Sequence, residues 1–227
     1  VKNIDISIPL PKSDEDEISG DSETGNMWLE KMANAIVAPG TEVTSIVSKS
    51  IVTQFGPAGS MQATNSATIN FEEISMVADL ETPQGNMTME LKNGSGVIKM
   101  MGQEQPLPPA MTGPMFNEIK NSYLNLALTY EDLNAEYLGT EIVDGNEYGV
   151  LKVMAESTIT ILVDMESALP FLSRTTELNP QTGSMVAAEN RYSDWTTVDG
   201  VTYAFSSVVF ADGNKVSESK VEALAVN

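Results

Sequence analysis

The chain changes its hydrophobic period at about residue 42 and keeps the new period almost to its end. From there, apolar side chains recur at every second position within short segments, which is the spacing of β-strands with one buried face. Residues 63–71 show this, because Ala67 and Ile69 share one face while Ser66 and Thr68 lie on the other. A chain built this way must bury one face of a long antiparallel sheet.

The segments with this pattern are separated by Gly, Pro and Asn turns, so consecutive strands are expected to pair as a meander. Asp-Gly pairs at 144–145, 199–200 and 212–213 are typical of hairpin turns. A change of phase after residue 205 predicts a bulge near Ser206 and Ser207. Strands are expected at about residues 42–55, 63–71, 75–81, 86–92, 96–101, 136–143, 147–155, 157–165, 170–178, 184–196, 200–210 and 214–225.

Two helices are expected to accompany the sheet. The first is predicted at about 26–38, with Asn26 as its N-cap, because a continuous apolar stripe runs from Leu29 to Val37 and Pro39 follows it. The second is predicted at about 112–124, with Thr112 as its cap. Between them, Pro residues exclude a central strand at 105–109.

The composition excludes several classes of chemistry. The 227 residues include no Cys and no His, which removes disulfides, thiol chemistry, His-ligated zinc and the usual near-neutral general base. The formal charge of −20 predicts a surface that repels nucleic acid and anionic headgroups. Glycine-rich phosphate-binding loops and apolar stretches long enough to cross a membrane are also missing. We therefore predict a protein that is not an enzyme and uses no cofactor and no metal.

The first 25 residues differ from the rest, so we predict two regions: an acidic, Pro-containing linker or extended arm at 1–25, and one antiparallel β domain at 26–227. Ile4, Ile6 and Ile8 alternate with polar residues and could form a short extended segment. The chain begins at Val1 rather than Met, so it is expected to be a fragment of a longer polypeptide.

Methionine is the unusual residue of this sequence. Of its thirteen methionines, seven lie between residues 76 and 115. Methionine is pliable and recurs at apolar binding surfaces, although ordinary core packing is the alternative explanation. The predicted ligand-binding residues, on one strand, its neighbour and the inserted helix, are Met87, Met89, Leu91, Met100, Met115 and Phe116.

The C-terminal third resembles a known family. Asp164 and Leu169-Pro170-Phe171 are followed by Tyr192-Ser-Asp-Trp195 and Val198-Asp-Gly-Val201. This order is similar to the end of the LolA-like fold of outer-membrane lipoprotein carriers, although Ala204 stands where proline is usual. The resemblance implies a mainly β protein with a few helices (α+β). Its strongly curved antiparallel sheet, a half-barrel, would be covered by the leading helix and the helical insertion.

The same resemblance implies a function. A LolA-like domain would be a non-catalytic protein of the bacterial periplasm or cell envelope, binding a lipid, an acyl chain or a lipoprotein on the concave face of its sheet. A narrower resemblance is to domains of this kind that lie C-terminal to insulinase-type zinc peptidases. Residues 1–25 resemble the linker that joins such a domain to the peptidase. The alternative is therefore an accessory protein-interaction domain with no ligand of its own, fused to a peptidase. The peptidase motif His-x-x-Glu-His is absent from this chain.

Overall fold

The computed structural model describes residues 20–57, 59–178 and 185–227. Within these ranges the helices are α1 (Ser22–Ile36), α2 (Pro109–Lys120), α3 (Tyr123–Leu128) and the 3-10 turn η1 (Tyr130–Asp132). The strands are β1 (Ser45–Gly56), β2 (Gly59–Asn70), β3 (Ser75–Thr82), β4 (Gly85–Lys92), β5 (Ser95–Met100), β6 (Gln103–Pro106), β7 (Asn134–Val143), β8 (Asn146–Met154), β9 (Thr158–Asp164), β10 (Pro170–Leu178), β11 (Met185–Val198), β12 (Val201–Ala211) and β13 (Asn214–Val226).

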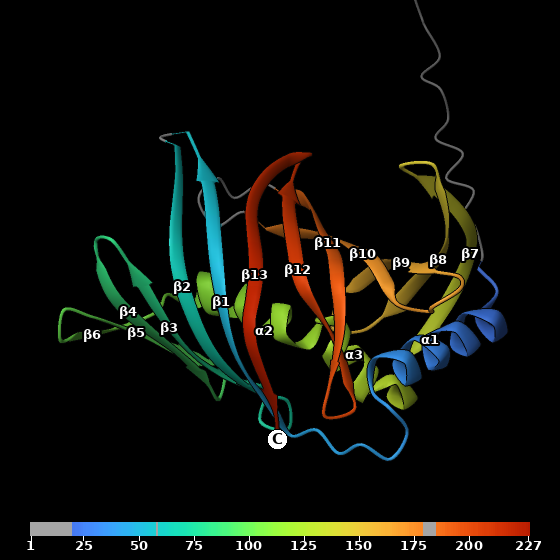
Figure 1. Cartoon of the computed structure of the whole chain (residues 1–227), viewed down its shortest axis with the longest axis horizontal. Coiled ribbons are helices and arrows are strands. Elements are labelled where there is room, and N and C mark those ends of the chain that lie inside the picture. Colours follow the sequence, from blue (N-terminus) through green and yellow to red (C-terminus); the bar gives the residue numbers. More distant parts are fainter. Residues whose placement is uncertain (1–19, 58, 179–184) are drawn as a thin grey trace, which may run out of the picture.

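All these strands belong to one antiparallel sheet, in the order β6-β5-β4-β3-β2-β1-β13-β12-β11-β10-β9-β8-β7. The sheet is two meanders joined where β1 pairs with β13, and β6 and β7 remain as its edges. Figure 1 shows that the sheet is strongly curved and that α2 and α3 lie within its curve. The predicted fold class, an open curved antiparallel sheet with a leading helix and a helical insertion, is confirmed. We call the face that carries the helices the concave face.

The main core lies between α1, α3 and the strands of the second meander. The predicted stripe of α1 is buried: Leu29, Met32 and Ile36 are almost completely shielded from solvent. They pack with side chains of α3 and of β7 to β9, including Leu124 and Ile161. This core anchors one half of the sheet, and the half formed by β2 to β6 has a smaller core of its own under α2.

The beginning of α1 differs from the prediction. The helix starts at Ser22 and is capped by Asp21, whose Oδ1 accepts hydrogen bonds from the Glu23 and Thr24 amides. The Thr24 hydroxyl also donates to Asp21 Oδ2, and this bond, followed by the amide bonds, lowers the pKa of Asp21. Asn26 is therefore not the N-cap; its Oδ1 accepts a hydrogen bond of 2.8 Å from the amide of Ala135 on β7. The expected extended segment with Ile4, Ile6 and Ile8 lies outside the described residues.

The helical insertion consists of two helices where one was predicted. Thr112 does not cap a helix; it is buried inside α2, which follows Pro108 directly. Ser122 breaks the helix and caps α3, its Oγ accepting from the Asn125 amide. The chain before α2 forms β6, an edge strand that ends at Pro106, which confirms that this segment is not a central strand.

The hairpin turns follow the sequence, whereas the bulge does not. Asp144, Asp199 and Asp212 all have positive φ, as the first residue of an Asp-Gly type I′ turn must. The register between β12 and β13 shifts between Val209 and Phe210, so the bulge lies three residues beyond the position predicted near residues 206 and 207. The alternation of side chains along β12 does not distinguish the predicted bulge site from the observed one. The site is fixed by the pairing of β12 with β13.

The face of β8 to β10 that points away from the helices carries another small core. Tyr148, Leu162 and Leu172 are buried there, and the rings of Tyr148 and Phe171 stack with centroids 4.3 Å apart. Val143, at the tip of the β7–β8 hairpin, packs against this cluster. The edge hairpin therefore curls over the outer face of its own sheet.

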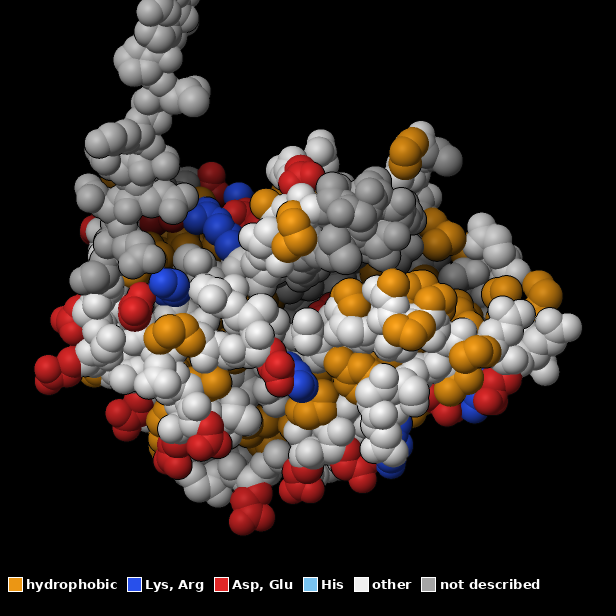
Figure 2. All heavy atoms as spheres, turned by 180° about the vertical axis from the view of Figure 1, so that it is seen from behind, with side chains coloured by type: hydrophobic (Ala, Val, Ile, Leu, Met, Phe, Trp, Pro, Cys, Tyr) orange, Lys and Arg blue, Asp and Glu red, His pale blue; other side chains and the backbone are white. Residues whose placement is uncertain are grey.

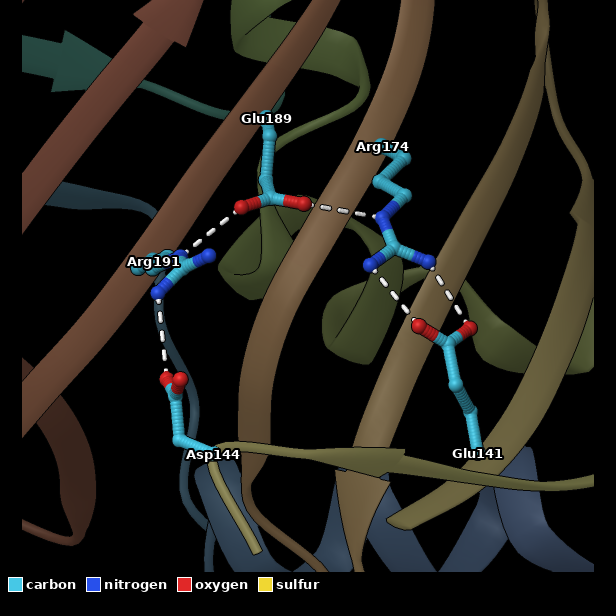
Figure 3. A network of polar contacts seen from close by, with 5 residues as sticks. All are labelled: Glu141, Asp144, Arg174, Glu189 and Arg191. Atoms are coloured by element: carbon cyan, nitrogen blue, oxygen red, sulfur yellow. Dashed lines mark hydrogen bonds and ion pairs between the residues drawn. The ribbon is translucent and has the colours of Figure 1, made fainter. Parts of the chain in front are cut away.

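Charged side chains tie this hairpin down, in an arrangement that we call the polar clamp (Figure 3). Arg174 on β10 donates to both carboxylate oxygens of Glu141 on β7, over 2.8 and 2.9 Å, and to Glu189 on β11. Arg191 donates to Glu189 and to Asp144 in the hairpin turn. The two guanidiniums thus link the curled hairpin to β10 and β11.

The Glu189→Gln variant is expected to unfold several degrees lower at pH 7, with a difference that shrinks towards pH 3.5. Burial raises the pKa of Glu189, but hydrogen bonds from Arg174 and Arg191 outweigh it, so the pKa lies below the ordinary 4.5. Such a carboxylate stabilises the folded state above its unfolded pKa and loses this contribution as the pH falls through the folded value. The loss at pH 7 should be about 1–2 kcal/mol, measured by thermal unfolding across the pH range.

Glu222→Gln is the matched control. Its ion pair with Lys49 spans 3.5 Å between side chains that are both about half exposed, so its removal should change stability by less than about 0.5 kcal/mol. A Glu189→Gln difference of the same size at pH 7 and pH 3.5 would contradict a stabilising charge at this position.

Candidate functional site

The predicted ligand-binding residues lie on the concave face of the first meander. Alternation along β4 places Met87, Met89 and Leu91 on one side of the strand. Leu91 and Met89 pack in the cluster that also holds Met115 and Phe116 of α2, so this side is the one that the helix covers. The structure therefore brings the strand and helix residues of the prediction together.

Cross-strand register groups these side chains into rows. Leu91 lies opposite Met76 on β3 and Gly96 on β5. Met89 lies two residue pairs further along, opposite Ala78 and Ile98. Met87 lies two pairs further again, where the row is completed by Leu80 and Met100. Side chains directly opposite one another are in contact distance, so each row is a continuous strip.

Burial falls steadily from the first row to the last. Leu91 is 1% exposed and forms the centre of the core under α2. Met89 and Met87 are half-buried, and Met100 is 53% exposed. We call the last strip, Leu80, Met87 and Met100, the methionine floor. Figure 2, which looks at the helix side, shows hydrophobic side chains gathered on the half of the molecule that β3 to β5 and α2 form.

The position of α2 over this surface depends on Gly96. A Cβ at this residue would lie 2.8 Å from both Leu107 Cδ1 and Leu91 Cδ2, and 2.9 Å from Thr112 Cγ2. Only a glycine lets the chain before α2 and the first turn of the helix approach β5 so closely.

Sequence reasoning missed two residues of this surface, Leu80 and Asn65. Asn65 on β2 lies directly opposite Leu80, in the row of the methionine floor. The signal was present, because Asn65 occupies an every-second position between Ala63 and Ala67, whose side chains are buried on the concave face. A polar residue that interrupts an apolar face is an indication of a special role.

A cavity of about 610 Å³ lies elsewhere, beside the polar clamp on the outer face. Arg174, Glu189 and Arg191 line it together with threonines such as Thr160. The two guanidiniums there are engaged by three carboxylates, so the cavity offers no net positive charge to an anion. The cavity therefore borders the polar clamp, whose role is structural, and is not the candidate ligand site.

The described residues hold neither an acidic cluster that could bind a metal ion nor a helix that could span a membrane. Among residues 20–57, 59–178 and 185–227, no three acidic side chains cluster closely enough to hold a metal ion. No helix within these ranges has the length and apolar character needed to cross a bilayer.

The described structure defines a class of protein: a single open antiparallel sheet whose concave face holds two helices. Comparison with known proteins narrows this class. No protein-family model matches the sequence, and no curated protein sequence matches it. Solved structures do match, and three of them each align with a TM-score of 0.61.

One is a putative outer membrane lipoprotein-sorting protein domain from Vibrio parahaemolyticus, 9% identical, with 91% of this chain and 94% of that chain covered. Another is a LolA superfamily protein from Nitrosomonas europaea, 13% identical, with 89% and 93% covered. A third is a DUF1329 family protein from Desulfovibrio piger, 10% identical, with 92% and 94% covered. The chain therefore has the LolA-like fold that its sequence motifs predict, while the peptidase context stays a prediction.

Proposed function

We propose that this protein is a non-catalytic domain of the bacterial cell envelope that binds an apolar ligand on the concave face of its sheet. The ligand is a lipid, an acyl chain or a lipoprotein, and it contacts the methionine floor and the neighbouring side chains of α2. The envelope location is supported by the likeness to a lipoprotein-sorting domain and a LolA superfamily protein. The lack of His and Cys supports a role without catalysis.

The observation that carries this proposal is the exposure of Met100 beside Met87. These two thioether side chains lie directly opposite one another on a face that helices otherwise cover. Exposed apolar strips that continue into a core are typical of binding surfaces, and methionine adapts its shape to flexible chains. Of the other predicted residues, the partly buried Met89, Met115 and Phe116 would form the inner wall against which a ligand rests, and Leu91 lies in the core behind them.

The double variant Met87→Gln/Met100→Gln is expected to bind the neutral fluorescent probe N-phenyl-1-naphthylamine at least about tenfold more weakly. Covering one methionine side chain with a ligand contributes about 1.5–3 kcal/mol when burial is complete, and tenfold in affinity corresponds to about 1.4 kcal/mol. Met100 is half exposed, and Met87, although half-buried, belongs to none of the core clusters of the described residues, so the variant should unfold at nearly the same urea concentration. Fluorescence titration and urea unfolding measure the two effects.

Met154→Gln is the matched control, since Met154 is 40% exposed but lies at the end of β8, in the other half of the sheet. Its probe affinity should equal that of the unmodified protein. Absence of probe binding by the unmodified protein, or equal losses in both variants, would contradict the proposed function. Met89→Gln adds a further comparison: as part of the core under α2 it should lower stability by about 2–5 kcal/mol.

A further inference from the structure

The methionine floor continues into polar residues along the same row of the sheet. From β1 to β5 the row consists of Ser50, Asn65, Leu80, Met87 and Met100, each directly opposite the next. Its first two members are polar and its last three are apolar. The concave face therefore changes character over the width of three strand pairs, about 14 Å from β2 to β5.

The polar end of this row contains an unused acceptor. The side-chain oxygen Oδ1 of Asn65 is shielded from solvent and has no hydrogen-bond partner. Ser50, its neighbour across the strand pair, is 5% exposed. Buried amide oxygens are almost always paired, because an unpaired one raises the free energy of the folded protein. A donor supplied by a ligand would remove this penalty.

Other unpaired amide oxygens of the described residues have different surroundings. Those of Asn121 and Asn125 belong to the connection between α2 and α3, where both amide nitrogens are engaged with Ser157 and the Lys120 carbonyl. That of Asn190 lies on β11, in the second meander. Asn65 differs from these residues because it lies directly opposite Leu80, a member of the methionine floor.

On the basis of the proposed function, we propose that the ligand is a neutral amphiphile with a hydrogen-bond donor in its polar head. Its hydrocarbon chain lies along Met100, Met87 and Leu80, and its head donates to Asn65 Oδ1 beside Ser50. A dodecyl chain has a length comparable to this row. Leu80 is the direct neighbour of Asn65, so a chain that lies on Leu80 brings its head group next to the unused oxygen.

The charge of the head group follows from the acceptor and from the protein. An amide oxygen attracts N–H and O–H donors and repels a carboxylate. The formal charge of −20 also disfavours an anionic ligand. Neutral amides and alcohols fit this site, and esters, which carry acceptors only, leave the oxygen of Asn65 unpaired.

Competition between two neutral ligands of equal chain length tests the inference. Dodecanamide and methyl laurate are used to displace N-phenyl-1-naphthylamine from the unmodified protein and from Asn65→Leu. Dodecanamide should bind the unmodified protein at least about fivefold more tightly than methyl laurate, and this preference should vanish in Asn65→Leu. Methyl laurate should bind both proteins equally or bind the variant more tightly.

Controls separate the inference from folding effects and from the proposed function. Ser66→Ala changes the adjacent residue, which faces the other side of β2, and should keep the preference for the amide. Asn65→Ala removes the oxygen without adding volume and should lose it, as Asn65→Leu does. Equal binding of amide and ester by the unmodified protein overturns the amphiphile inference alone. Failure of the probe and of both ligands to bind overturns the proposed function with it.

Free lipids and acylated proteins share this chemistry, and a third ligand distinguishes them. N-lauroyl-triglycine amide carries the same chain and an amide donor, followed by peptide. Tighter binding than dodecanamide would indicate an acylated protein as the ligand, and equal or weaker binding a free amphiphile. In either case the affinity must fall in Asn65→Leu for the inference to stand.

Discussion

Replacing Gly25 by alanine is expected to destabilise the protein by on the order of 3 kcal/mol, the upper end of the usual cost of overpacking. Gly25 lies in the first turns of α1, on the side that faces β7. A Cβ there would lie 2.3 Å from the carbonyl oxygen of Ala135 and 2.8 Å from the carbonyl carbon of Glu136. Both are backbone atoms of β7, against which α1 packs, so only a shift of the whole helix can relieve the clash. Urea unfolding followed by circular dichroism measures the loss.

Gly113→Ala is the matched control for this prediction. Gly113 is also inside a helix, α2, but a Cβ there would meet nothing within 4 Å. Alanine favours the helix over glycine by up to about 1 kcal/mol, so this variant should be as stable as the unmodified protein or slightly more so. Equal stability of Gly25→Ala and Gly113→Ala would mean that α1 does not approach β7 as closely as described.

The strands could be predicted from the sequence because the alternation of apolar and polar residues within each strand shows which of its faces is buried. A period of two depends only on which face of a strand is covered, and the turns between strands depend on local φ preferences. Asp199-Gly200 and Asp212-Gly213 therefore gave correct hairpins without knowledge of the rest. No local sequence pattern indicates that β1 pairs with β13, since the two strands are separated by most of the chain.

The helix ends could not be predicted because long-range contacts decide them. Asn26 has the side chain of a good N-cap, but its oxygen is used by the Ala135 amide of β7, and Asp21 takes the capping role. Thr112 is likewise a good cap by residue type, but it is buried between α2 and β5. Gly25 has no signal at all, since a glycine within a helix indicates only a weak helix former.

The sequence predicted which residues of the candidate site share one face of the sheet, but not how deeply each of them is buried. Alternation placed Met87, Met89 and Leu91 on one face, and the structure agrees. The boundary between core and open surface depends on which side chains α2 covers, and this follows from contacts between segments far apart in the chain, such as Leu91 with Ile119. Period two alone gives every residue of a face the same weight. For this reason Leu91, which is core, and Met100, which is exposed, could not be told apart.

Replacing Tyr123 by alanine is expected to cost about 3–5 kcal/mol of stability, the usual range for truncating a buried aromatic side chain. Tyr123 begins α3 and fills the space between that helix and β11 and β12. Its ring meets Tyr192 and Trp195 edge-on at centroid distances of 5.0 and 5.1 Å, and it lies 5.8 Å from the ring of Tyr203. Alanine would leave a cavity in an aromatic cluster that cannot collapse without moving the helix.

Tyr123→Phe separates the hydroxyl from the ring. The hydroxyl oxygen accepts a hydrogen bond of 3.0 Å from the buried amide of Ala204, and burial raises the pKa of Tyr123, so the group stays neutral throughout the measurement. Phenylalanine keeps the ring contacts but leaves that amide unpaired, which should cost about 1–3 kcal/mol. Tyr130→Phe is the control, because among the described residues the Tyr130 hydroxyl bonds only to the exposed carboxylate of Glu131, at 3.3 Å; this variant should lose less than about 0.5 kcal/mol. Urea unfolding should therefore rank the variants Tyr130→Phe, Tyr123→Phe, Tyr123→Ala in order of increasing loss. A Tyr123→Phe variant as stable as the control would show that water or another group pairs the Ala204 amide, and that α3 is held to β12 by ring packing alone.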